Sequence, residues 1–227
     1  MTRSANAKVE QAFDRKAQRF DRQMALFEKY VLGRARQWAV GNARGRVVDL
    51  AVGSGMNLPH YGPVVEQVIG VDLSDGMLDI ARRRVADQQL TKVELRKGDV
   101  QALDLPDGSV DTVVSTYTFC TIPDPGRASA EAYRVLRPGG LFVLAEHGPS
   151  NNAVTAWLMR RIDSVRLRID TDHLSRDPVP FLREAGVELE DVQRTGLGGV
   201  TFRVLASKNA DTDTDSVMRS PCADGYH

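Results

Sequence analysis

The sequence predicts an α/β fold with a mostly parallel sheet, because two apolar strands each end in residues suited to a ligand. Residues 47–50 predict a buried strand, and the loop that follows them is rich in small residues that permit a tight turn. A second apolar run, residues 68–71, ends on Asp72. An acid at such a strand tip can accept both hydroxyls of a ribose, which indicates a ligand of the adenosine type.

The segment before this core predicts a long helix. Between residues 5 and 42 apolar side chains recur at intervals of three and four, which places them on one helical face, and Gly33 predicts a bend or break. The residues of that face are Phe13, Ala17, Phe20, Met24, Phe27 and Val31. We expect the face to pack on the core of the protein.

Helices and strands alternate after Asp72. Ser74 is placed to cap a helix over residues 75–86, and residues 128–136 predict another helix. The expected strands are residues 92–97, 110–115, 141–145, 187–192 and 201–206. A further helix is expected at residues 151–169, and residues 172–177 introduce another that runs to Ala185. No second domain is expected, and the polar residues 208–227 predict a disordered tail.

Composition is ordinary for a globular domain. Hydrophobic residues make up 42% and charged residues 26% of the 227 residues. Thirty basic and thirty acidic residues cancel, which argues against a nucleic-acid binder. Residues 1–46 carry eleven basic and four acidic residues, an excess that could favour an anionic membrane surface, although a solvated helix face is the preferred interpretation.

Targeting and metal-binding signals are missing from the sequence. It has no run of about 18 apolar residues and no signal peptide, so we expect a cytoplasmic protein. Cys120 and Cys222 cannot form a disulfide framework, and no Cys/His cluster has the spacing of metal ligands. We therefore expect no structural metal, and we expect Cys120 to be a small buried side chain.

The spacing of small residues between residues 46 and 57 distinguishes between cofactors. A dinucleotide fingerprint has the form G-x-G-x-x-G and holds a pyrophosphate at a helix N-terminus. Here the pattern is A-x-G-x-G, with Leu58 in place of the third glycine and no basic residue directly after it. A nicotinamide-dependent oxidoreductase is therefore disfavoured, although nicotinamide absorbance changes would revive that interpretation.

Four features together resemble the class I S-adenosylmethionine (SAM) methyltransferases. The A-x-G-x-G loop is similar to their motif I, and Asp72 is similar to their ribose-binding acid. A third strand leads into Asp99, which is similar to the acid that accepts the adenine amino group. Residues 131–140 match the E-x-x-R-V-L-R-P-G-G segment of the family at the expected distance downstream.

The resemblance implies a fold and a set of contacts. The fold is a Rossmann-like, seven-stranded, mostly parallel sheet with helices on both faces. Its parts would be an N-terminal helical lid (residues 1–45), the SAM-binding domain (residues 46–207) and the tail (residues 208–227). In the family the lid covers the cofactor, which makes Phe20 and Tyr30 candidate contacts. The other expected SAM contacts are Asp49, Ala51, Gly53, Ser54, Gly55, Asn57, Asp72, Leu73, Met77, Asp99, Val100 and Thr116.

A narrower resemblance concerns the methyl acceptor. Residues 53–61, the pair Glu146-His147 and residues 173–177 resemble one branch of the superfamily. That branch holds thiol S-methyltransferases of the methyltransferase-like group, their bacterial relatives and bacterial phosphatidylethanolamine N-methyltransferases. A small-molecule thiol is the favoured acceptor, and phosphatidylethanolamine or another nitrogen or oxygen acceptor is the alternative. His147 and His173, which titrate near neutral pH when unperturbed, are the candidate catalytic residues.

Residues 116–119 follow the fourth strand and are expected to flank the methyl group. Two departures from the family are notable. Ala51 replaces the usual first glycine, and the N-terminal apolar anchor of the animal members is missing, which favours a soluble substrate. A non-catalytic SAM-binding module is the third interpretation, which a failure to form S-adenosylhomocysteine with any acceptor would support.

Overall fold

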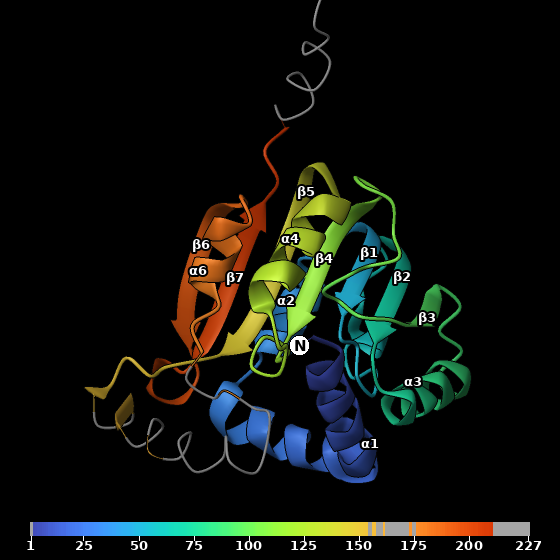
Figure 1. Ribbon diagram of the computed structural model, residues 1–227, viewed down its shortest axis with the longest axis horizontal. Helices are drawn as coiled ribbons and strands as arrows, with labels where there is room; N and C mark the ends of the chain where they lie inside the picture. Colours follow the sequence, from blue (N-terminus) through green and yellow to red (C-terminus); the bar gives the residue numbers. More distant parts are fainter. Residues whose placement is uncertain (1, 154–155, 158–160, 162–172, 174–175, 211–227) are drawn as a thin grey trace, which may run out of the picture.

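A seven-stranded sheet organises the residues that this computed structural model describes, which are residues 2–153, 156–157, 161, 173 and 176–210 (Figure 1). The strands are β1 (Gly45–Leu50), β2 (Val65–Asp72), β3 (Val93–Lys97), β4 (Val110–Thr116), β5 (Leu136–His147), β6 (Glu188–Thr195) and β7 (Thr201–Ser207). Their order is β3-β2-β1-β4-β5-β7-β6, and all neighbours are parallel except that β7 is antiparallel to β5 and β6. The predicted seven-stranded, mostly parallel sheet is confirmed.

Helices cover both faces of the sheet, as predicted. They are α1 (Thr2–Phe27), η1 (Glu28–Leu32), α2 (Ala35–Gly41), η2 (Leu58–His60), α3 (Asp75–Asp87), α4 (Pro125–Val135), α6 (Val179–Glu184) and η3 (Leu197–Gly199). On β1, Val48 and Leu50 belong to the core that α4 and α6 cover, whereas Val47 belongs to the core that α3 covers. This division arises because successive side chains of a strand point to opposite faces. In the part of the chain that the structure describes, no helix is long and apolar enough to span a bilayer.

The N-terminal helical segment breaks where the sequence predicted. α1 continues into the π-helical turn η1, and Gly33 then adopts a φ of 69° before α2 begins at Ala35. Glycine reaches that φ without a steric penalty because it has no side chain. The break turns α2 back onto the sheet, where Ala35 and Ala39 pack with Val143 and Ala145 of β5.

α4 begins earlier than the sequence predicted, at Pro125 rather than Ala128. Asp124 caps the helix, because its Oδ1 accepts a hydrogen bond from the backbone N–H of Arg127 at 3.0 Å. Proline fits the first turn of a helix, where its missing N–H is not needed. The pair Asp124-Pro125 therefore marks the start of α4, although it precedes the apolar residues on which the prediction was based.

α6 lies where the sequence predicted a helix, between the introducing segment of residues 172–177 and Ala185. Pro178 and Pro180 fit its start, because a proline is tolerated in the first turn of a helix. Most of the helix expected over residues 151–169, and residues 211–227 of the expected tail, lie outside the described residues.

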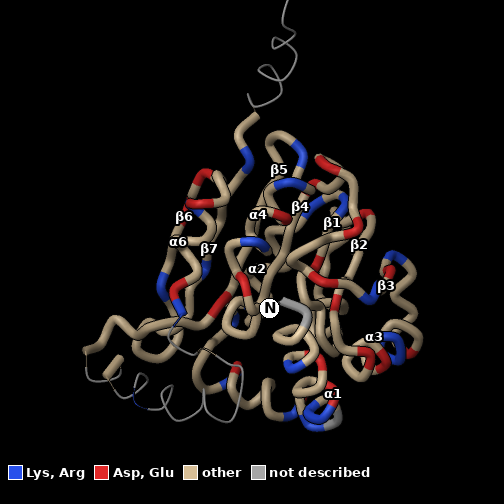
Figure 2. Tube along the Cα trace, viewed as in Figure 1, with Lys and Arg blue, Asp and Glu red and all other residues tan. Residues whose placement is uncertain are grey.

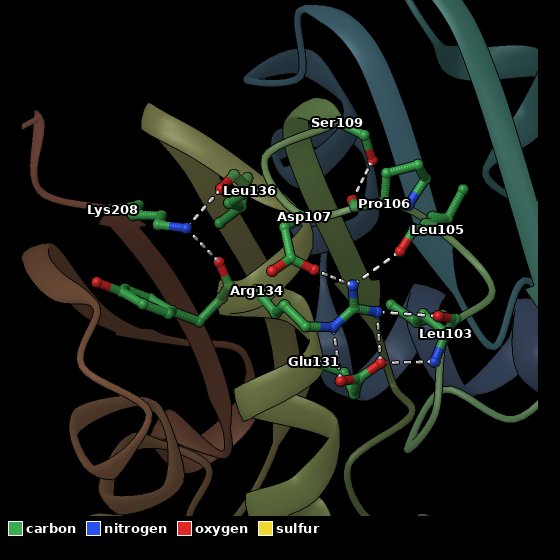
Figure 3. A network of polar contacts seen from close by, with 10 residues as sticks. Leu103, Leu105, Pro106, Asp107, Ser109, Glu131, Arg134, Leu136 and Lys208 are labelled. Carbon is green, nitrogen blue, oxygen red and sulfur yellow. Dashed lines mark hydrogen bonds and ion pairs between the residues drawn. The ribbon is translucent and has the colours of Figure 1, made fainter. Parts of the chain in front are cut away.

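A polar network around Arg134 holds the loop that precedes β4 (Figure 3). Arg134 donates hydrogen bonds to the backbone carbonyls of Leu103 and Leu105 at 2.9 and 2.8 Å. It also forms ion pairs with Glu131 at 2.8 Å and with Asp107 at 2.6 Å. The neighbouring guanidinium lowers the pKa of Glu131 below its ordinary value. The E-x-x-R part of the segment that resembles the methyltransferases therefore anchors a loop.

Lys208 belongs to the folded domain, although the sequence placed it in the tail. Its Nζ donates to the backbone carbonyls of Tyr133 and Leu136 at 3.1 and 2.9 Å (Figure 3). The backbone of Lys208 pairs with Gly139 and Gly140 through hydrogen bonds of 2.8 and 3.0 Å. β5 begins well before the predicted strand, so both glycines lie within it.

Candidate cofactor site

A cavity of about 780 Å³, partly open to solvent, lies at the carboxyl ends of the central strands. It occupies the point where the strand order reverses between β1 and β4, which is where ligands bind in open α/β sheets. Gly53, Asp72 and Asp99 converge on its inner wall, and α1 lies across its outer side (Figure 1).

The loop after β1 depends on the small residues at its centre. Gly55 adopts a φ of 77°, and a Cβ atom there would lie 2.7 Å from the Cδ1 atom of Leu58. That distance is far below van der Waals contact, so a side chain at position 55 would displace Leu58 from the core beneath α3. The N–H of Val52 donates to the carbonyl of Val71 at 3.0 Å and ties the loop to β2.

Ala51 also has a left-handed backbone, with a φ of 47°. For a residue with a side chain this conformation costs roughly 1–2 kcal/mol. We predict that Ala51→Gly raises the free energy of unfolding by about 1 kcal/mol, because relief of this strain outweighs the greater chain entropy of glycine. Urea unfolding of the two proteins measures the difference, and a lower midpoint for the variant would contradict the prediction.

Asp72 ties the glycine loop to the start of α3. Its Oδ2 accepts the N–H of Gly53 and its Oδ1 accepts the N–H of Ser74, both at 2.8 Å. Burial raises the pKa of Asp72 to about 6, and the backbone hydrogen bonds offset this rise only in part. A carboxylate has about four acceptor positions, so about two are left for the hydroxyls of a ligand.

Asp99 follows β3 and is covered by the N-terminal helix. Its Oδ1 accepts from the backbone N–H and from the side-chain amide of Gln101, both at 2.9 Å. Its Oδ2 accepts from the side-chain amide of Asn6 at 2.6 Å. Since Asn6 lies in the second turn of α1, the helix reaches across the whole mouth of the cavity.

Two acidic side chains of α1 hold this helix against α3 and the loop after β1. Asp14 accepts a hydrogen bond from the hydroxyl of Ser74 at 2.5 Å. Further along the helix, Asp21 pairs with Arg84 of α3 and accepts from the hydroxyl of Ser54. The same side of α1 places Phe20 in the cavity wall. The structure therefore has the predicted N-terminal helix in a closed position.

Asp49 lies behind the loop rather than in the cavity. Its two oxygens accept from the side-chain amide of Asn57 at 3.0 and 2.9 Å, and Oδ2 also accepts from the Tyr61 hydroxyl at 2.9 Å. Because the amide nitrogen of Asn57 faces Asp49, its Oδ1 faces Arg36 and accepts from Nη1 at 2.6 Å. Burial raises the pKa of Asp49 to about 6. Asp49 and Asn57 thus position Arg36.

Arg36 is a cation in the cavity wall, supplied by α2. Its buried side chain forms an ion pair with Glu28, and Nη1 donates to the hydroxyl of Thr116 at 3.2 Å. The guanidinium lies over the ring of Tyr117, with its central carbon 5.3 Å from the ring centroid. Because Glu28 offsets the charge of Arg36, the wall repels a cationic ligand less than an unpaired arginine would.

Tyr117 has a strained backbone in the cavity wall, with a φ of 57°. The conformation is held in place, because its N–H donates to Ala145 at 2.9 Å while the N–H groups of Thr118 and Phe119 donate to Glu146. Burial raises the pKa of Tyr117 above its ordinary value, so the phenol stays protonated. Among the described residues its buried hydroxyl has no hydrogen-bond partner. Strain of this kind is concentrated at functional sites.

Comparison with known proteins identifies the family. Residues 48–144 match the family described as a methyltransferase domain. The chain is 33% identical over 178 residues to a ubiquinone/menaquinone biosynthesis C-methyltransferase from Methylobacterium nodulans, a match that covers 71% of this chain and 69% of that protein. The chain belongs to the class I SAM-dependent methyltransferases.

Other methyltransferases match part of the chain. A phosphatidylethanolamine N-methyltransferase from Cereibacter sphaeroides is 43% identical over 116 residues, which cover 50% of this chain and 57% of that relative. The matched region thus spans little more than half of that relative's length. A solved SAM-dependent methyltransferase from Thermotoga maritima superimposes with a TM-score of 0.67 over 87% of this chain and 98% of its own, at 22% identity. That likeness shows the fold alone.

The cavity of this methyltransferase suits each part of SAM. Asp72 offers acceptors for the ribose hydroxyls, and Asp99 together with the apolar side chain of Val100 suits the adenine. Arg36 suits the carboxylate of the methionine end, because a guanidinium matches carboxylate geometry. When bound, SAM supplies an activated methyl group on a sulfonium. These residues would hold its two ends apart along the strand tips.

Most of the SAM contacts predicted from the sequence lie in the cavity wall of this methyltransferase. They are Phe20, Ala51, Gly53, Ser54, Asp72, Leu73, Met77, Asp99, Val100 and Thr116. Asp49, Gly55 and Asn57 lie behind the wall, where they shape the loop. Tyr30 does not reach the cavity, because its side chain lies on the outer surface of η1 and is 67% exposed.

The two candidate catalytic histidines lie outside the cavity wall. His147 ends β5 and is buried edge-on against the ring of Phe27, with the centroids 6.4 Å apart. The backbone N–H of His173 donates to the carbonyl of Cys120 at 2.9 Å, and Cys120 is buried. A role of either histidine in proton transfer stays a prediction.

Arg36 is the residue of the site that sequence patterns did not single out. It lies in a helix whose other buried residues are Ala35, Ala39 and Val40. A single arginine within an otherwise apolar helical face was the available signal, because such a charge is rarely buried without a partner. Its partners Glu28 and Asn57 come from other elements, so their pairing could be found only in the folded chain.

Proposed function

We propose that this protein transfers the methyl group of SAM to a nucleophilic heteroatom of an apolar small molecule, with a thiol sulfur as the preferred acceptor. The observation that carries the proposal is the character of one end of the cavity. There, Tyr117 packs in an apolar cluster with Leu32, Val200 and Met24. Its hydroxyl is a buried polar group that lacks a partner among the described residues. Such surroundings suit a hydrophobic acceptor with one polar reacting atom.

The titratable groups of the cavity favour an acceptor that ionises easily. The described residues of the wall include no His, Lys or Cys, and both Asp72 and Asp99 already accept hydrogen bonds. At a pH of about 7.5, roughly a tenth of a thiol with a pKa of about 8.5 is ionised, whereas only about a thousandth of an amine with a pKa of about 10.4 is neutral. Without a base, a thiol therefore presents far more of its reactive form.

These residues act mainly by positioning. An in-line transfer requires the acceptor lone pair and the methyl carbon to be collinear and shielded from water, an effect worth about 7–11 kcal/mol in well-oriented systems. α1 lies across the cavity and shields part of it from solvent. The protonated phenol of Tyr117 can donate a hydrogen bond to the reacting heteroatom, and the stacked Arg36 holds its ring in place.

An acceptor screen with radiolabelled SAM tests the proposal. Apolar thiols are expected to yield S-adenosylhomocysteine and an S-methylated product identified by mass spectrometry, whereas amines and phenols of similar size should react more slowly. Transfer confined to amines or phenols would overturn the thiol assignment. If no acceptor yields S-adenosylhomocysteine, the non-catalytic SAM-binding interpretation gains support.

Tyr117→Phe tests the acceptor end of the cavity. We expect kcat/KM for the acceptor to fall about fivefold while the Kd for SAM is unchanged, because one hydrogen bond contributes about 1 kcal/mol. The melting temperature should not fall, because the variant removes a buried hydroxyl without a partner among the described residues. Tyr133→Phe, outside the cavity wall, is the matched control for steady-state kinetics. Equal kcat/KM for both variants and the wild type would remove Tyr117 from acceptor recognition.

Phosphatidylethanolamine is the second candidate acceptor. The 43% identity to the Cereibacter sphaeroides phosphatidylethanolamine N-methyltransferase supports it. The same screen therefore includes this lipid in mixed micelles, with N-methylated lipid as the product to be measured. Faster transfer to the lipid amine than to any thiol would make it the preferred acceptor.

A further inference from the structure

One surface of the N-terminal segment combines exposed apolar and basic side chains. Leu26, Phe27 and Tyr30 are 53%, 37% and 67% exposed. Four basic residues of the same segment are also exposed, and they are Arg19, Arg22, Lys29 and Arg34. We call the exposed side chains of residues 19–34 the α1–η1 surface. Figure 2 colours the Lys and Arg positions along α1 blue.

The acidic residues of this segment are engaged by arginines of the neighbouring helices. Asp21 pairs with Arg84 of α3, and Glu28 pairs with Arg36 of α2. These two are the only acids between residues 19 and 34. Both acids of the segment are therefore neutralised by arginines outside it. The remaining charges of the α1–η1 surface are all positive.

The two faces of this segment have different surroundings, because one faces solvent and the other faces the cavity. Arg22, Leu26 and Tyr30 recur at intervals of four residues and are exposed, so they share the outer face. Phe20 and Met24 on the inner face line the cavity. The same short stretch of helix thus separates the cavity from the α1–η1 surface.

The apolar part of this surface continues onto η3. Gly196 packs against η1 so closely that a Cβ atom there would lie 2.5 Å from the carbonyl oxygen of Val31. The next residue, Leu197, is 69% exposed. η1 and η3, which are far apart in the sequence, therefore lie against each other, and each carries an exposed apolar side chain.

We propose that the α1–η1 surface, together with Leu197, docks on an anionic lipid surface. Amphipathic helices with apolar and aromatic side chains flanked by Lys and Arg lie in the plane of a membrane interface. Anionic headgroups attract basic residues at that surface, and uncompensated acids would oppose the attraction. Docking would place the cavity mouth beside the bilayer, where apolar acceptors concentrate. The inference holds whichever heteroatom is methylated.

Co-sedimentation of the full chain with vesicles tests this docking. The protein is expected to bind vesicles of phosphatidylcholine with phosphatidylglycerol and not vesicles of phosphatidylcholine alone, and salt of about 1 M should weaken the binding by screening. The variant Arg22→Gln/Lys29→Gln/Arg34→Gln should bind at least about tenfold more weakly, because each basic residue contributes to attraction by the anionic surface. Leu26→Ser/Leu197→Ser should also weaken binding while the melting temperature is unchanged.

Matched controls come from other exposed positions. Arg83→Gln/Arg127→Gln/Arg183→Gln removes the same charge from α3, α4 and α6, and Val64→Ser removes an apolar side chain that is 64% exposed. Both controls should bind like the wild type. The proposal would be overturned by a wild type that ignores anionic vesicles, or by equal losses in the two triple variants.

Two further measurements distinguish lipid docking from self-association and from methylation itself. Sedimentation velocity without lipid shows whether Leu26→Ser/Leu197→Ser abolishes self-association, a result that would assign the surface to a second copy of the chain and overturn lipid docking. Methylation of a water-soluble acceptor, assayed in parallel, reports on the proposed function alone. Failure of vesicle binding with intact methylation would reject the docking and leave the proposed function standing.

Discussion

Asp72→Asn is expected to weaken SAM binding about 100-fold or more, as measured by calorimetry. Asp72 presents a buried carboxylate to the cavity. The N–H groups of Gly53 and Ser74 occupy part of its acceptor positions, and the others face a ligand. Hydrogen bonds to a charged group contribute about 1.5–3 kcal/mol each, and the variant loses the charge that two ribose hydroxyls would meet. Asp75→Asn, on the exposed side of the same turn, is the control and should bind SAM normally. Unchanged affinity of Asp72→Asn would remove the central assignment.

The pH dependence of SAM binding gives a second test of Asp72. Its pKa is raised by burial from 3.8 to about 6, so the wild type should lose affinity by about tenfold per pH unit below about 6 as the carboxylate takes up a proton. Asp72→Asn should show a flatter profile. A profile identical to that of the wild type would assign the pH dependence elsewhere.

The stability of the ligand-free protein should change with pH in the opposite direction. The folded-state pKa values of Asp49 and Asp72, about 6, lie above their ordinary value of 3.8, so proton binding favours the folded state. This contribution is fully present below about 3.8 and is lost as the pH rises through about 6. A comparison of melting temperatures between the wild type and Asp72→Asn over this range isolates the part that Asp72 contributes.

Arg36→Met is expected to lower the free energy of unfolding by about 3 kcal/mol and to weaken SAM binding strongly. The substitution leaves the Glu28 carboxylate without its ion-pair partner, whereas Oδ1 of Asn57 keeps the hydrogen bond from the Thr116 hydroxyl at 3.2 Å. Removal of one partner from a buried ion pair commonly costs about 3–5 kcal/mol. The substitution also removes the guanidinium that suits the SAM carboxylate. Thermal unfolding and calorimetry measure the two effects separately.

The double variant Arg36→Met/Glu28→Gln decides whether Arg36 serves the fold or the ligand. Neutralising Glu28 should restore most of the lost stability, because no unpaired charge is then buried. SAM affinity should stay low. Arg82→Met removes an exposed ion pair with Asp79 and should change neither property. Wild-type SAM affinity in the double variant would limit Arg36 to a structural role.

Local sequence patterns predicted helix ends correctly where a capping or helix-breaking residue lies at the point where the apolar spacing changes. Ser74 was predicted to cap α3, and its hydroxyl accepts from the N–H of Met77 at 3.1 Å. The break at Gly33 was also predicted. The start of α4 was not, because the apolar spacing begins only at Ala128 and the cap at Asp124 lies before it.

The placement of Tyr30 shows the limit of transferring a contact by resemblance. Phe20 and Tyr30 lie on the same helical segment, but ten residues separate them, and at 3.6 residues per turn this places the two side chains about 80° apart around the helix. Phe20 faces the cavity and Tyr30 faces outward.

The sequence by itself determined the sheet, the glycine loop and the acids at the strand tips, because each depends on residues adjacent in the chain. Parallel strands place their carboxyl ends at one edge, so Gly53, Asp72 and Asp99 had to converge. The tertiary structure alone decided which side chains complete the cavity. Arg36 faces it because Glu28 and Asn57 orient its guanidinium, and Tyr117 lacks a partner there among the described residues because the elements packed around it are apolar. Such pairings join segments that only folding brings together.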